Sequence, residues 1–480
     1  MPKAKEKNKL TKEALTELLE LIRENYLADS RPWVIGYSGG KDSSCVLQLT
    51  WQAISKLPVE KRSKSIYVLS SDTLVETPAI VNQLTKSQEQ INVAAKKQKM
   101  PFQALVVVPE INNTFWTNLI GRGYPAPYKN FRWCTERMKI SPTSEFIKKQ
   151  VAQYGEVVIL LGARKTESIS RGQVMARRNE LGNRLSRHNT LQNAWVFTPI
   201  EDWDTADVWT YLINTPSPWG NNNRELVTMY RNAQSGECPL VIDKTTPSCG
   251  GGRFGCWTCT VVQRDRSMEA MIENGQTWMQ PMLDFRDWLA STQDPAKKKN
   301  IREHRRRTGR IQYGEKDGKK KIIWGPYKLK VRQDILKRLL KAQTEVQKNG
   351  PDPNMELIQK QELHNIRRLW VHEEGDWEDT LPSIYNEIIG GSLNWVSDDA
   401  SGLGGEEKKL ISDVCNKHEL NPILLMELFD VEQAHQGMAK RRGIYDKIGS
   451  ILNKDWRTRE EALAELENAE QESEVEAALG

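Results

Sequence analysis

The chain has 480 residues, enough for two or three domains that each have their own core. Its net charge is only +6, and no apolar stretch approaches the roughly 20 residues needed to cross a bilayer, which argues against a membrane-spanning protein. The basic residues 1–8 lead into an amphipathic helix predicted over residues 10–26, not into the apolar centre of a signal peptide. We therefore expect a soluble, cytoplasmic protein without a membrane partner.

Strand and helix signals alternate up to about residue 215. Short apolar runs predict strands at residues 33–37, 65–70, 103–108, 157–162 and 195–197. Longer amphipathic stretches between them predict helices, among them residues 78–99 and 142–154. This alternation predicts an α/β fold in which helices cover both faces of a parallel sheet. Ligands of such sheets bind beyond the carboxyl ends of the strands.

The first predicted strand runs into residues 37–44, which read Tyr-Ser-Gly-Gly-Lys-Asp-Ser-Ser. The two glycines let consecutive backbone N–H groups point at an anion, and the start of the following helix adds positive potential. Lys41 and the hydroxyls of Ser38, Ser43 and Ser44 complete a cradle suited to pyrophosphate. The Gly-x-x-x-x-Gly-Lys spacing of a Walker A loop is missing.

This stretch resembles the SGGxDS loop of the ATP pyrophosphatases, the PP-loop family with an adenine nucleotide alpha hydrolase-like fold. The resemblance implies that the chain binds ATP, transfers its AMP part and releases pyrophosphate. The matching nucleotide contacts are Ser38, Gly39, Gly40, Lys41, Asp42, Ser43 and Ser44. Lys41 and Asp42 are also expected to act in catalysis. The alternative is an ordinary Gly-containing turn between a strand and a helix.

Asp72 and Thr73 follow the second predicted strand. A carboxylate and a hydroxyl at this position can hold Mg²⁺ or a ribose near the phosphates, but they can equally cap the next helix. Adenylyl- and phosphoadenylyl-sulfate reductases, a branch of the PP-loop family, carry a similar segment here. The resemblance therefore favours the nucleotide role.

Residues 132–142 resemble the Cys-x-x-x-x-Lys-x-x-Pro segment of the same reductases. Arg132, Arg137 and Lys139 surround Cys134 in the sequence, so we expect its thiol to have a lowered pKa and to be nucleophilic. A buried structural cysteine is the alternative.

Residues 162–171 resemble the family's Gly-x-Arg-x-x-Glu-Ser-x-x-Arg segment. Gly162 would permit close approach to the nucleotide, while Arg164 and Arg171 would stabilise charge on the phosphoryl group. Residues 198–209 match the closing Pro-Ile-x-x-Trp-x-x-x-Asp-Val-Trp segment, whose residues we expect to be structural.

Four of the seven cysteines, Cys238, Cys249, Cys256 and Cys259, have the spacing C-x₁₀-C-x₆-C-x₂-C. Four thiolates suit either tetrahedral zinc or an iron–sulfur cube. Only one Cys-x-x-Cys pair is present, whereas zinc ribbons usually have two, so the pattern favours a [4Fe–4S] cluster. A set of structural disulfides fits poorly with a cytosolic protein.

The C-terminal half begins with a strongly basic stretch at residues 297–321, which we expect to contact DNA phosphates; a solvated surface loop is the alternative. Helices are predicted at 327–347 and 353–370, a linker at 390–405, and a small helical unit at 406–451 before an acidic end. The predicted divisions are an N-terminal helix at 1–29, a PP-loop domain at 30–215, a Cys-rich iron–sulfur segment at 216–270, a basic and helical region at 271–390, and a C-terminal helical region at 406–480.

A PP-loop domain followed by this cysteine pattern and a basic, helical part resembles the DndC family of bacterial DNA phosphorothioation systems. The resemblance implies replacement of a non-bridging DNA phosphate oxygen by sulfur, with ATP, Mg²⁺ and a [4Fe–4S] cluster as cofactors. It also implies DNA, a cysteine desulfurase as sulfur donor and DndD- and DndE-type proteins as partners. Cys134 is the candidate sulfur carrier.

Three other functions remain open. A tRNA thiolase would share ATP activation, sulfur transfer and a cluster. A phosphoadenylyl-sulfate reductase is disfavoured because the chain lacks the family's C-terminal Glu-Cys-Gly tail. A non-catalytic DNA-binding or scaffold subunit would release no pyrophosphate.

Overall fold

The computed structural model describes residues 10–167, 185–232, 255–316, 319–396, 404–436, 438, 441–465 and 468. The chain is divided into two compact units. The first unit comprises residues 1–110, 132–259 and 264–277, and the second comprises residues 111–131, 260–263 and 278–480. No helix among the described residues is long and apolar enough to cross a membrane.

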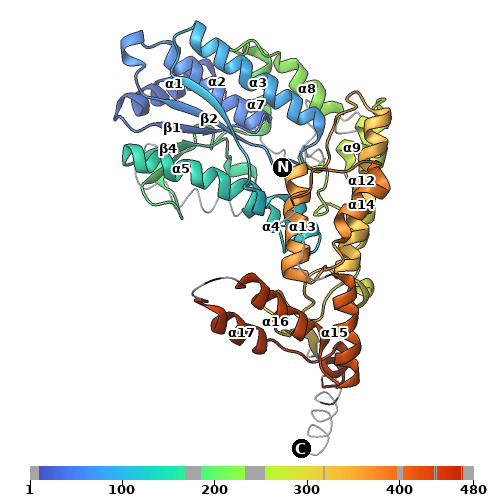
Figure 1. The fold of residues 1–480 in the computed structure, drawn as a ribbon. Helices are drawn as coiled ribbons and strands as arrows, with labels where there is room; N and C mark the ends of the chain where they lie inside the picture. Colours follow the sequence, from blue (N-terminus) through green and yellow to red (C-terminus); the bar gives the residue numbers. More distant parts are fainter. Residues whose placement is uncertain are drawn as a thin grey trace, which may run out of the picture. The chain divides into compact units, whose positions relative to one another are not determined.

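The first unit is built on a six-stranded sheet with the order β3-β2-β1-β4-β6-β5 (Figure 1). Its strands are β1 (Trp33–Gly36), β2 (Ile66–Ser71), β3 (Phe102–Val107), β4 (Val157–Leu160), β5 (Leu185–Arg187) and β6 (Ala194–Phe197). All neighbouring pairs are parallel except β5 and β6. The predicted parallel sheet is confirmed.

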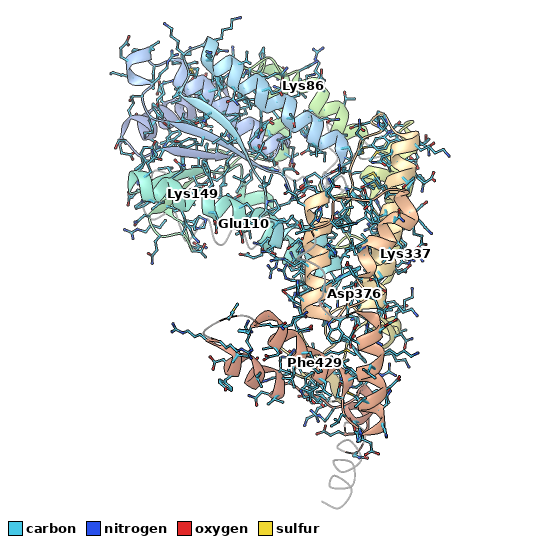
Figure 2. The ribbon with its side chains drawn as sticks, viewed as in Figure 1. Lys86, Glu110, Lys149, Lys337, Asp376 and Phe429 are labelled. Carbon is cyan, nitrogen blue, oxygen red and sulfur yellow. The ribbon has the colours of Figure 1, made fainter. Side chains whose placement is uncertain are left out.

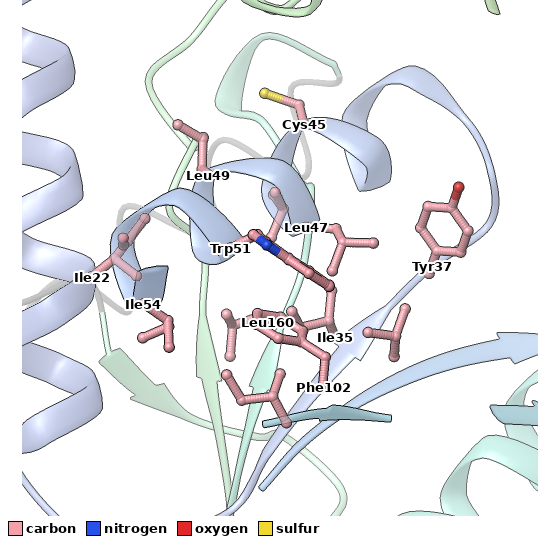
Figure 3. Packing of buried hydrophobic residues seen from close by; sticks show 14 of the residues in the cluster. Ile22, Ile35, Tyr37, Cys45, Leu47, Leu49, Trp51, Ile54, Phe102 and Leu160 are labelled. Atoms are coloured by element: carbon pink, nitrogen blue, oxygen red, sulfur yellow. The ribbon is translucent and has the colours of Figure 1, made fainter. Parts of the chain in front are cut away.

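Helices pack on both faces of this sheet. The larger core lies between the sheet and α1 (Lys12–Leu27), α2 (Lys41–Ser55), α3 (Pro78–Lys97) and α7 (Thr205–Asn214). Within it the Trp51 and Phe102 rings stack with centroids 4.5 Å apart (Figure 3). On the other face, α5 (Ser141–Tyr154) buries Ile147 against β4 and β6. Burial on both sides explains the uninterrupted Val-Val-Ile-Leu run of β4.

The first unit also has shorter helical segments within its described residues. They include η1 (Val59–Lys61), α4 (Trp133–Thr135), the π-helical turn η4 (Glu136–Ile140), η5 (Lys165–Glu167), α8 (Asn223–Asn232) and α9 (Arg266–Glu273). At the start of α7, Asp204 and Asp207 form a capping box, and Trp209 of the same helix is fully buried. The closing segment at 198–209 is therefore structural, as expected.

The second unit is mainly helical. Its helices include α10 (Gln280–Ser291), α12 (Leu329–Asn349), α13 (Lys360–Glu374) and α14 (Thr380–Ile389). It also contains η3 (Thr117–Gly121), α11 (Lys298–Ile301) and the antiparallel hairpin of β7 (Tyr313–Lys316) and β8 (Lys319–Ile322). Lys337 projects from α12 (Figure 2), and its Nζ lies 2.8 Å from Glu387 Oε2 on α14.

Residues 111–131 belong to this second unit although they lie between β3 and β4 in the chain. The Trp116 indole donates to Leu357 O, and the Trp370 indole of α13 donates to Ile120 O. A Cβ on Gly121 would lie 2.8 Å from Leu369 Cδ1, so the turn packs tightly against α13. Nothing in the local sequence pattern indicated this long-range packing.

Further along the chain lie α15 (Gly405–Lys417), α16 (Pro422–Ala434) and α17 (Ile444–Leu452), which confirms the predicted helical unit. The helix predicted at 353–370 begins too early, because α13 starts only at Lys360. Gln359 and Glu362 form the capping box that starts α13, with Gln359 N donating to Glu362 Oε2 at 3.0 Å.

Candidate functional site

The predicted phosphate loop lies between β1 and α2, at the carboxyl end of a central strand. Gly39 has a φ of +71°, which favours glycine, and Gly40 is the N-cap of α2. The Ser43 hydroxyl donates to Gly40 O at 3.0 Å and accepts from Ser38 N at 3.2 Å. The Ser38 and Ser43 hydroxyls are also 3.2 Å apart. The loop is thus closed by its own side chains at a helix N-terminus, the geometry of an anion site.

Two predicted cations converge on Asp42 in the first turn of α2. Lys41 Nζ lies 2.8 Å from Asp42 Oδ2, and Arg164 Nε lies 2.8 Å from Asp42 Oδ1. Arg164 is buried, and its Nη1 donates to Thr205 Oγ1 at 3.1 Å. Arg164 comes from the loop after β4, so the tertiary fold brings it to the phosphate loop. A bound phosphate would share these cations with Asp42.

Tyr230 on α8 is a site residue that the sequence did not reveal. Its hydroxyl accepts from Lys41 N at 3.3 Å, and Lys41 Nζ lies 5.7 Å from the centre of its ring. The ring packs edge-on against Trp209 at 5.2 Å. Tyr230 has no motif around it, since only the fold brings α8 to the loop.

Gly162 allows the loop after β4 to touch the start of α2. A Cβ added at Gly162 would lie 2.8 Å from both the backbone C and O of Asp42 and 3.1 Å from Ser43 N. Backbone atoms cannot give way as a flexible side chain can. The structure therefore needs glycine at position 162 for close packing against the helix start, and its close approach to a nucleotide stays a prediction.

Asp72 and Thr73 shape the turn after β2. Asp72 Oδ1 accepts from Leu74 N at 2.8 Å, and Leu74 has a φ of +63°. Burial raises the pKa of Asp72, helped by the charge of Glu76, despite the Leu74 N–H. Thr73 is fully buried, and its hydroxyl donates to Glu76 Oε1 at 3.0 Å. Both predicted side chains thus hold the turn together, and their binding of Mg²⁺ or ribose stays a prediction.

The Cys-x-x-Cys segment pairs with this turn through its backbone. Trp257 N donates to Val75 O at 3.0 Å, and the Thr77 hydroxyl donates to Gly255 O at 2.9 Å. Cys256 Sγ lies 3.3 Å from Thr73 Oγ1 and 3.6 Å from Glu76 Oε1. Within the first unit, the Cys256 thiol therefore packs against the loop that follows β2.

Lys139 of η4 lies in the same cluster, with its Nζ 3.1 Å from Glu76 Oε1. Burial acts to lower the pKa of Lys139, but the charges of Cys256, Glu76 and Cys134 outweigh it and raise this pKa. Burial and the nearby Glu76 carboxylate raise the pKa of Cys256, against the opposing effect of Lys139. Lys139 is thus the cation that interacts electrostatically with the Glu76 carboxylate and with the Cys256 and Cys134 thiols.

The prediction of a lowered pKa for Cys134 is wrong for the thiol as it stands. Burial raises the pKa of Cys134, and the charge of Cys259 raises it further. Cys134 lies on α4, where Arg132 is exposed. The charged group that raises the pKa of Cys134 is another thiol, Cys259, and the arginines close in sequence do not outweigh burial and this thiol. Cys134, Cys256 and Cys259 therefore share one environment in the first unit.

Three predicted site residues, Arg171, Cys238 and Cys249, lie outside the described residues. Within the described part of the chain, no group of three or more His, Cys, Asp or Glu side chains is arranged to hold a metal ion. The described half of the predicted cluster is a tight turn, in which Cys259 N donates to Cys256 O at 3.1 Å. Its partly buried thiols fit the donor set of an iron–sulfur cluster or zinc.

The basic stretch at 297–321 divides into two kinds of residue. Arg302 is buried and donates to the carbonyls of Gly325 and Trp324, and Arg306 also donates to Trp324 O. Arg305 lies over the Trp456 ring at 4.9 Å. These three arginines hold the second unit together. Among the residues of the stretch whose side chains the structure describes, the exposed cations are Lys297, Lys299, Arg307, Arg310, Lys320 and Lys321.

Residues 32–261 match the family described as the phosphoadenosine phosphosulfate reductase domain. The match includes the phosphate loop, Arg164, Cys134 and the Cys-x-x-Cys turn. This part of the chain, with its mostly parallel sheet, is therefore similar to the phosphoadenosine phosphosulfate reductase domain.

Two uncharacterized proteins of Methanocaldococcus jannaschii are similar to the chain, at 25% identity over 198 residues and 29% over 197 residues. The alignments cover 41% and 40% of this chain and 35% and 39% of those proteins. The chain thus spans little more than a third of the length of the curated relatives it matches.

Solved structures also resemble part of the chain. The phosphoadenylyl-sulfate reductase of Candida auris has 15% identity and a TM-score of 0.26, over 42% of this chain and 86% of that chain. The U34-tRNA thiolase NcsA of Methanococcus maripaludis, solved with its [4Fe–4S] cluster, has 11% identity and a TM-score of 0.27, over 55% and 88%.

Proposed function

We propose that the protein activates a DNA backbone phosphate with ATP and replaces one non-bridging oxygen by sulfur. The observation that carries the proposal is the packing of Cys256 against the loop after β2, where its Sγ lies 3.3 Å from Thr73 Oγ1. This loop leaves the same edge of the sheet as the phosphate loop. A nucleotide site and thiols in one domain suit an adenylyl transfer followed by a sulfur transfer.

In the first step, a non-bridging oxygen of the DNA phosphodiester attacks the α-phosphorus of ATP. The new P–O bond joins AMP to the DNA phosphate, and pyrophosphate leaves with the electron pair of the broken bond. Lys41 and Arg164 stabilise the negative charge of this transition state. Asp42, which pairs with both cations, keeps them oriented when the loop holds no phosphate. Ser38 and Ser43 hold the loop in shape.

In the second step, a sulfur nucleophile attacks the activated DNA phosphorus, and AMP leaves. With hydrosulfide the atoms and electrons balance, and one proton is released. With a persulfide on Cys134, the remaining S–S bond must be cleaved by two electrons from a thiol reductant. The Cys256 and Cys259 thiols, with Cys238 and Cys249, would hold a [4Fe–4S] cluster, which can bind or position sulfur. A cysteine desulfurase would supply the sulfur, and DndD- and DndE-type proteins would act alongside.

Assays on anaerobically purified protein test this proposal. The full chain is incubated with ATP, Mg²⁺, a cysteine desulfurase, cysteine and either duplex DNA or tRNA. We expect DNA-dependent pyrophosphate release and phosphorothioate-linked dinucleotides in a nuclease digest, detected by mass spectrometry. Thiolated tRNA nucleosides with unmodified DNA would identify a tRNA thiolase instead. An absence of pyrophosphate release with either acceptor would contradict the enzymatic role altogether.

Iron and acid-labile sulfide are measured in the same sample, together with its visible spectrum. We expect a brown protein with roughly four irons and four sulfides per chain, as a cube requires. A colourless, zinc-loaded protein would contradict the cluster assignment while leaving the nucleotide chemistry intact.

A further inference from the structure

A small aromatic surface in the second unit is not used by the proposed chemistry. Tyr128 and Phe131 face each other across a tight turn, where Phe131 N donates to Tyr128 O at 2.8 Å and Tyr128 N donates to Phe131 O at 3.3 Å. Their rings are 5.8 Å apart, and the Phe131 ring is nearly parallel to that of Tyr124 at 6.4 Å. We call Tyr124, Tyr128 and Phe131 the aromatic platform.

The three rings of the aromatic platform are at least partly exposed to solvent, unlike the side chains of a buried core. The Tyr128 side chain is 41% exposed, and Tyr124 and Phe131 are partly exposed. The apolar side chains that anchor this stretch are different ones, since Phe115, Trp116, Leu119 and Ile120 are all buried. The platform rings are therefore not the residues that hold the segment in the second unit.

The backbone beneath the platform is held rigidly. Tyr327 N donates to Gly123 O at 2.6 Å, and the Tyr327 hydroxyl accepts from Ala126 N at 3.0 Å. Pro127 O accepts from Thr260 Oγ1 at 2.7 Å and from Gln293 Nε2 at 2.8 Å. These hydrogen bonds fix the backbone on both sides of Tyr124. Binding a ligand to the rings therefore costs little conformational entropy, because no loop has to be ordered first.

Two positively charged side chains, Arg307 and Lys129, lie next to the aromatic platform in space or in sequence. Arg307 Cζ lies 5.5 Å from the centre of the Tyr124 ring, and Arg307 belongs to the basic stretch at 297–321. Arg307 Nη2 also lies 3.5 Å from Glu373 Oε2, a long ion pair. Lys129, at the tip of the turn, is exposed. Rings with an adjacent guanidinium and ammonium match an unpaired nucleobase and its phosphate, because bases stack on aromatic faces and cations pair with phosphates.

We propose that the aromatic platform stacks an unpaired nucleobase of the DNA acceptor, with Arg307 and Lys129 contacting the adjoining phosphates. This inference rests on the proposed function for its choice of acceptor. Phe131 is also only three residues before Cys134 in the chain. A base drawn out of the duplex would leave its flanking phosphate less encumbered, at the cost of a few kcal/mol of unstacking that the platform would offset.

The test compares Tyr128→Ala and Tyr128→Phe in the full chain, using fluorescence anisotropy with labelled oligodeoxynucleotides. The probes are a single strand of about 20 nucleotides, the same strand with abasic sites, its duplex, and that duplex with one unpaired base. We expect Tyr128→Ala to weaken single-strand binding by between about fivefold and a hundredfold, and Tyr128→Phe to bind like the wild type. The preference for the duplex with an unpaired base should disappear in Tyr128→Ala.

Two features separate stacking from a general loss of affinity. On the abasic strand Tyr128→Ala should bind like the wild type, because no base is left to stack. Arg307→Gln should reduce the slope of log affinity against log salt by about one, whereas Tyr128→Ala should leave this slope unchanged. Tyr445→Ala, which removes a tyrosine that is 85% exposed on α17, is the matched control and should not change binding.

The stacking proposal would be overturned if the wild type and Tyr128→Ala bound the single strand with equal affinity. It would also be overturned if Tyr128→Ala lost as much affinity for the abasic strand as for the intact strand. Pyrophosphate release and sulfur insertion are measured in parallel. If DNA is thiolated while Tyr128→Ala binds normally, the platform is wrong and the proposed function stands. If the platform effect is present but no pyrophosphate is released, the proposed function is wrong and the platform stands.

Discussion

The loops after β1 and β2 leave neighbouring strands of one sheet, yet they are stabilised differently. The first loop is closed by contacts that span five residues or fewer, such as Ser38 N to Ser43 Oγ and Ser43 Oγ to Gly40 O. The second loop is stabilised by residues about 180 positions further along the chain, through Trp257 N to Val75 O and Thr73 Oγ1 to Cys256 Sγ. The first is a local motif, while the second depends on long-range tertiary contacts.

This difference has a functional consequence. The locally closed loop can form whenever β1 and α2 form, although Arg164 and Tyr230 reach it only through the tertiary fold. The second loop combines two local hydrogen bonds, from Leu74 N to Asp72 and from Thr73 to Glu76, with the docking of the Cys-x-x-Cys turn. A change in the cysteine segment should therefore alter the surroundings of Asp72 and Thr73, whereas the phosphate loop should tolerate it.

The largest effect is expected at the thiols. Cys256→Ser should remove most of the iron and the visible absorbance, because serine is a poor ligand for iron–sulfur clusters. Cys134→Ser should keep its iron and lose phosphorothioation, as expected for a sulfur carrier. Iron content, sulfide content and DNA sulfur are measured for both variants.

The control for these thiol variants is Cys415→Ala, which changes a fully buried cysteine of α15 and should keep both iron and activity. An iron loss in Cys134→Ser equal to that in Cys256→Ser would make Cys134 a ligand, as its proximity to Cys259 allows. Full iron in Cys256→Ser would contradict the assignment of this turn.

Gly162→Ala should lower the rate of pyrophosphate release by about a hundredfold or more. The new Cβ would meet the backbone of Asp42 at 2.8 Å and displace the first turn of α2, and a misplacement of about 1 Å at a reacting site can cost that much. Gly391→Ala, where a Cβ would meet nothing within 4 Å, is the matched control. A normal rate in Gly162→Ala would mean that the helix start does not hold the nucleotide.

Arg164→Lys should slow pyrophosphate release by about ten- to a hundredfold, less than the hundred- to thousandfold typical when such a group is removed. Lysine keeps the charge, but it cannot reach both Asp42 and Thr205 as the guanidinium does. The neighbouring Lys165→Ala breaks ion pairs with Glu201 and Asp202 and should change the rate by less than about twofold. Equal rates for wild type and Arg164→Lys would show that charge alone matters there.

The last prediction concerns pH and the stability of the second unit, which carries neither of the two loops. Burial raises the pKa of Glu362 from 4.5 to about 7, although Gln359 N and nearby polar groups act to lower it. A raised folded-state pKa contributes stability below about pH 4.5 that is lost as the pH rises through about 7. Glu362→Gln removes this loss, so its stability relative to wild type should rise by up to roughly 3 kcal/mol between pH 5 and pH 8.

Urea unfolding of both proteins at these two pH values measures this shift. Glu387→Gln is the control, because the ion pair with Lys337 lowers the pKa of Glu387 and leaves it ionised at both pH values. Its stability difference from wild type should therefore not depend on pH. A pH-independent difference for Glu362→Gln would show that Glu362 is not a buried acid.

Local patterns predicted the sheet well, because buried parallel strands carry continuous apolar runs. The five strands predicted in the first 200 residues are all present within two residues of their predicted ends. The additional strand β5 reads Leu-Ser-Arg at an edge, too short and too polar for such a signal. The start of α13 was misplaced because the capping box at Gln359 and Glu362, not Pro353, begins the helix.

The candidate site divides in the same way. The phosphate loop, Gly162 and Arg164 belong to short motifs, and the fold brings these motifs together. Tyr230 and the contacts of Glu76 with Lys139 and Cys256 had no local signal, because each joins segments that are far apart in sequence. The lowered pKa expected for Cys134 failed for the same reason, since charges near in sequence were outweighed by burial and by Cys259.

The amino-acid sequence by itself determined the α/β class, the phosphate loop and the thiol content, because these depend on hydrophobic periodicity and on motifs of a few residues. Only the tertiary structure decided which thiols share one environment, that residues 111–131 belong to the second unit, and which arginines of the basic stretch hold the fold. The physical reason is range: a turn or strand is stabilised by its neighbours in the chain, whereas burial and electrostatic fields depend on every segment that packs nearby.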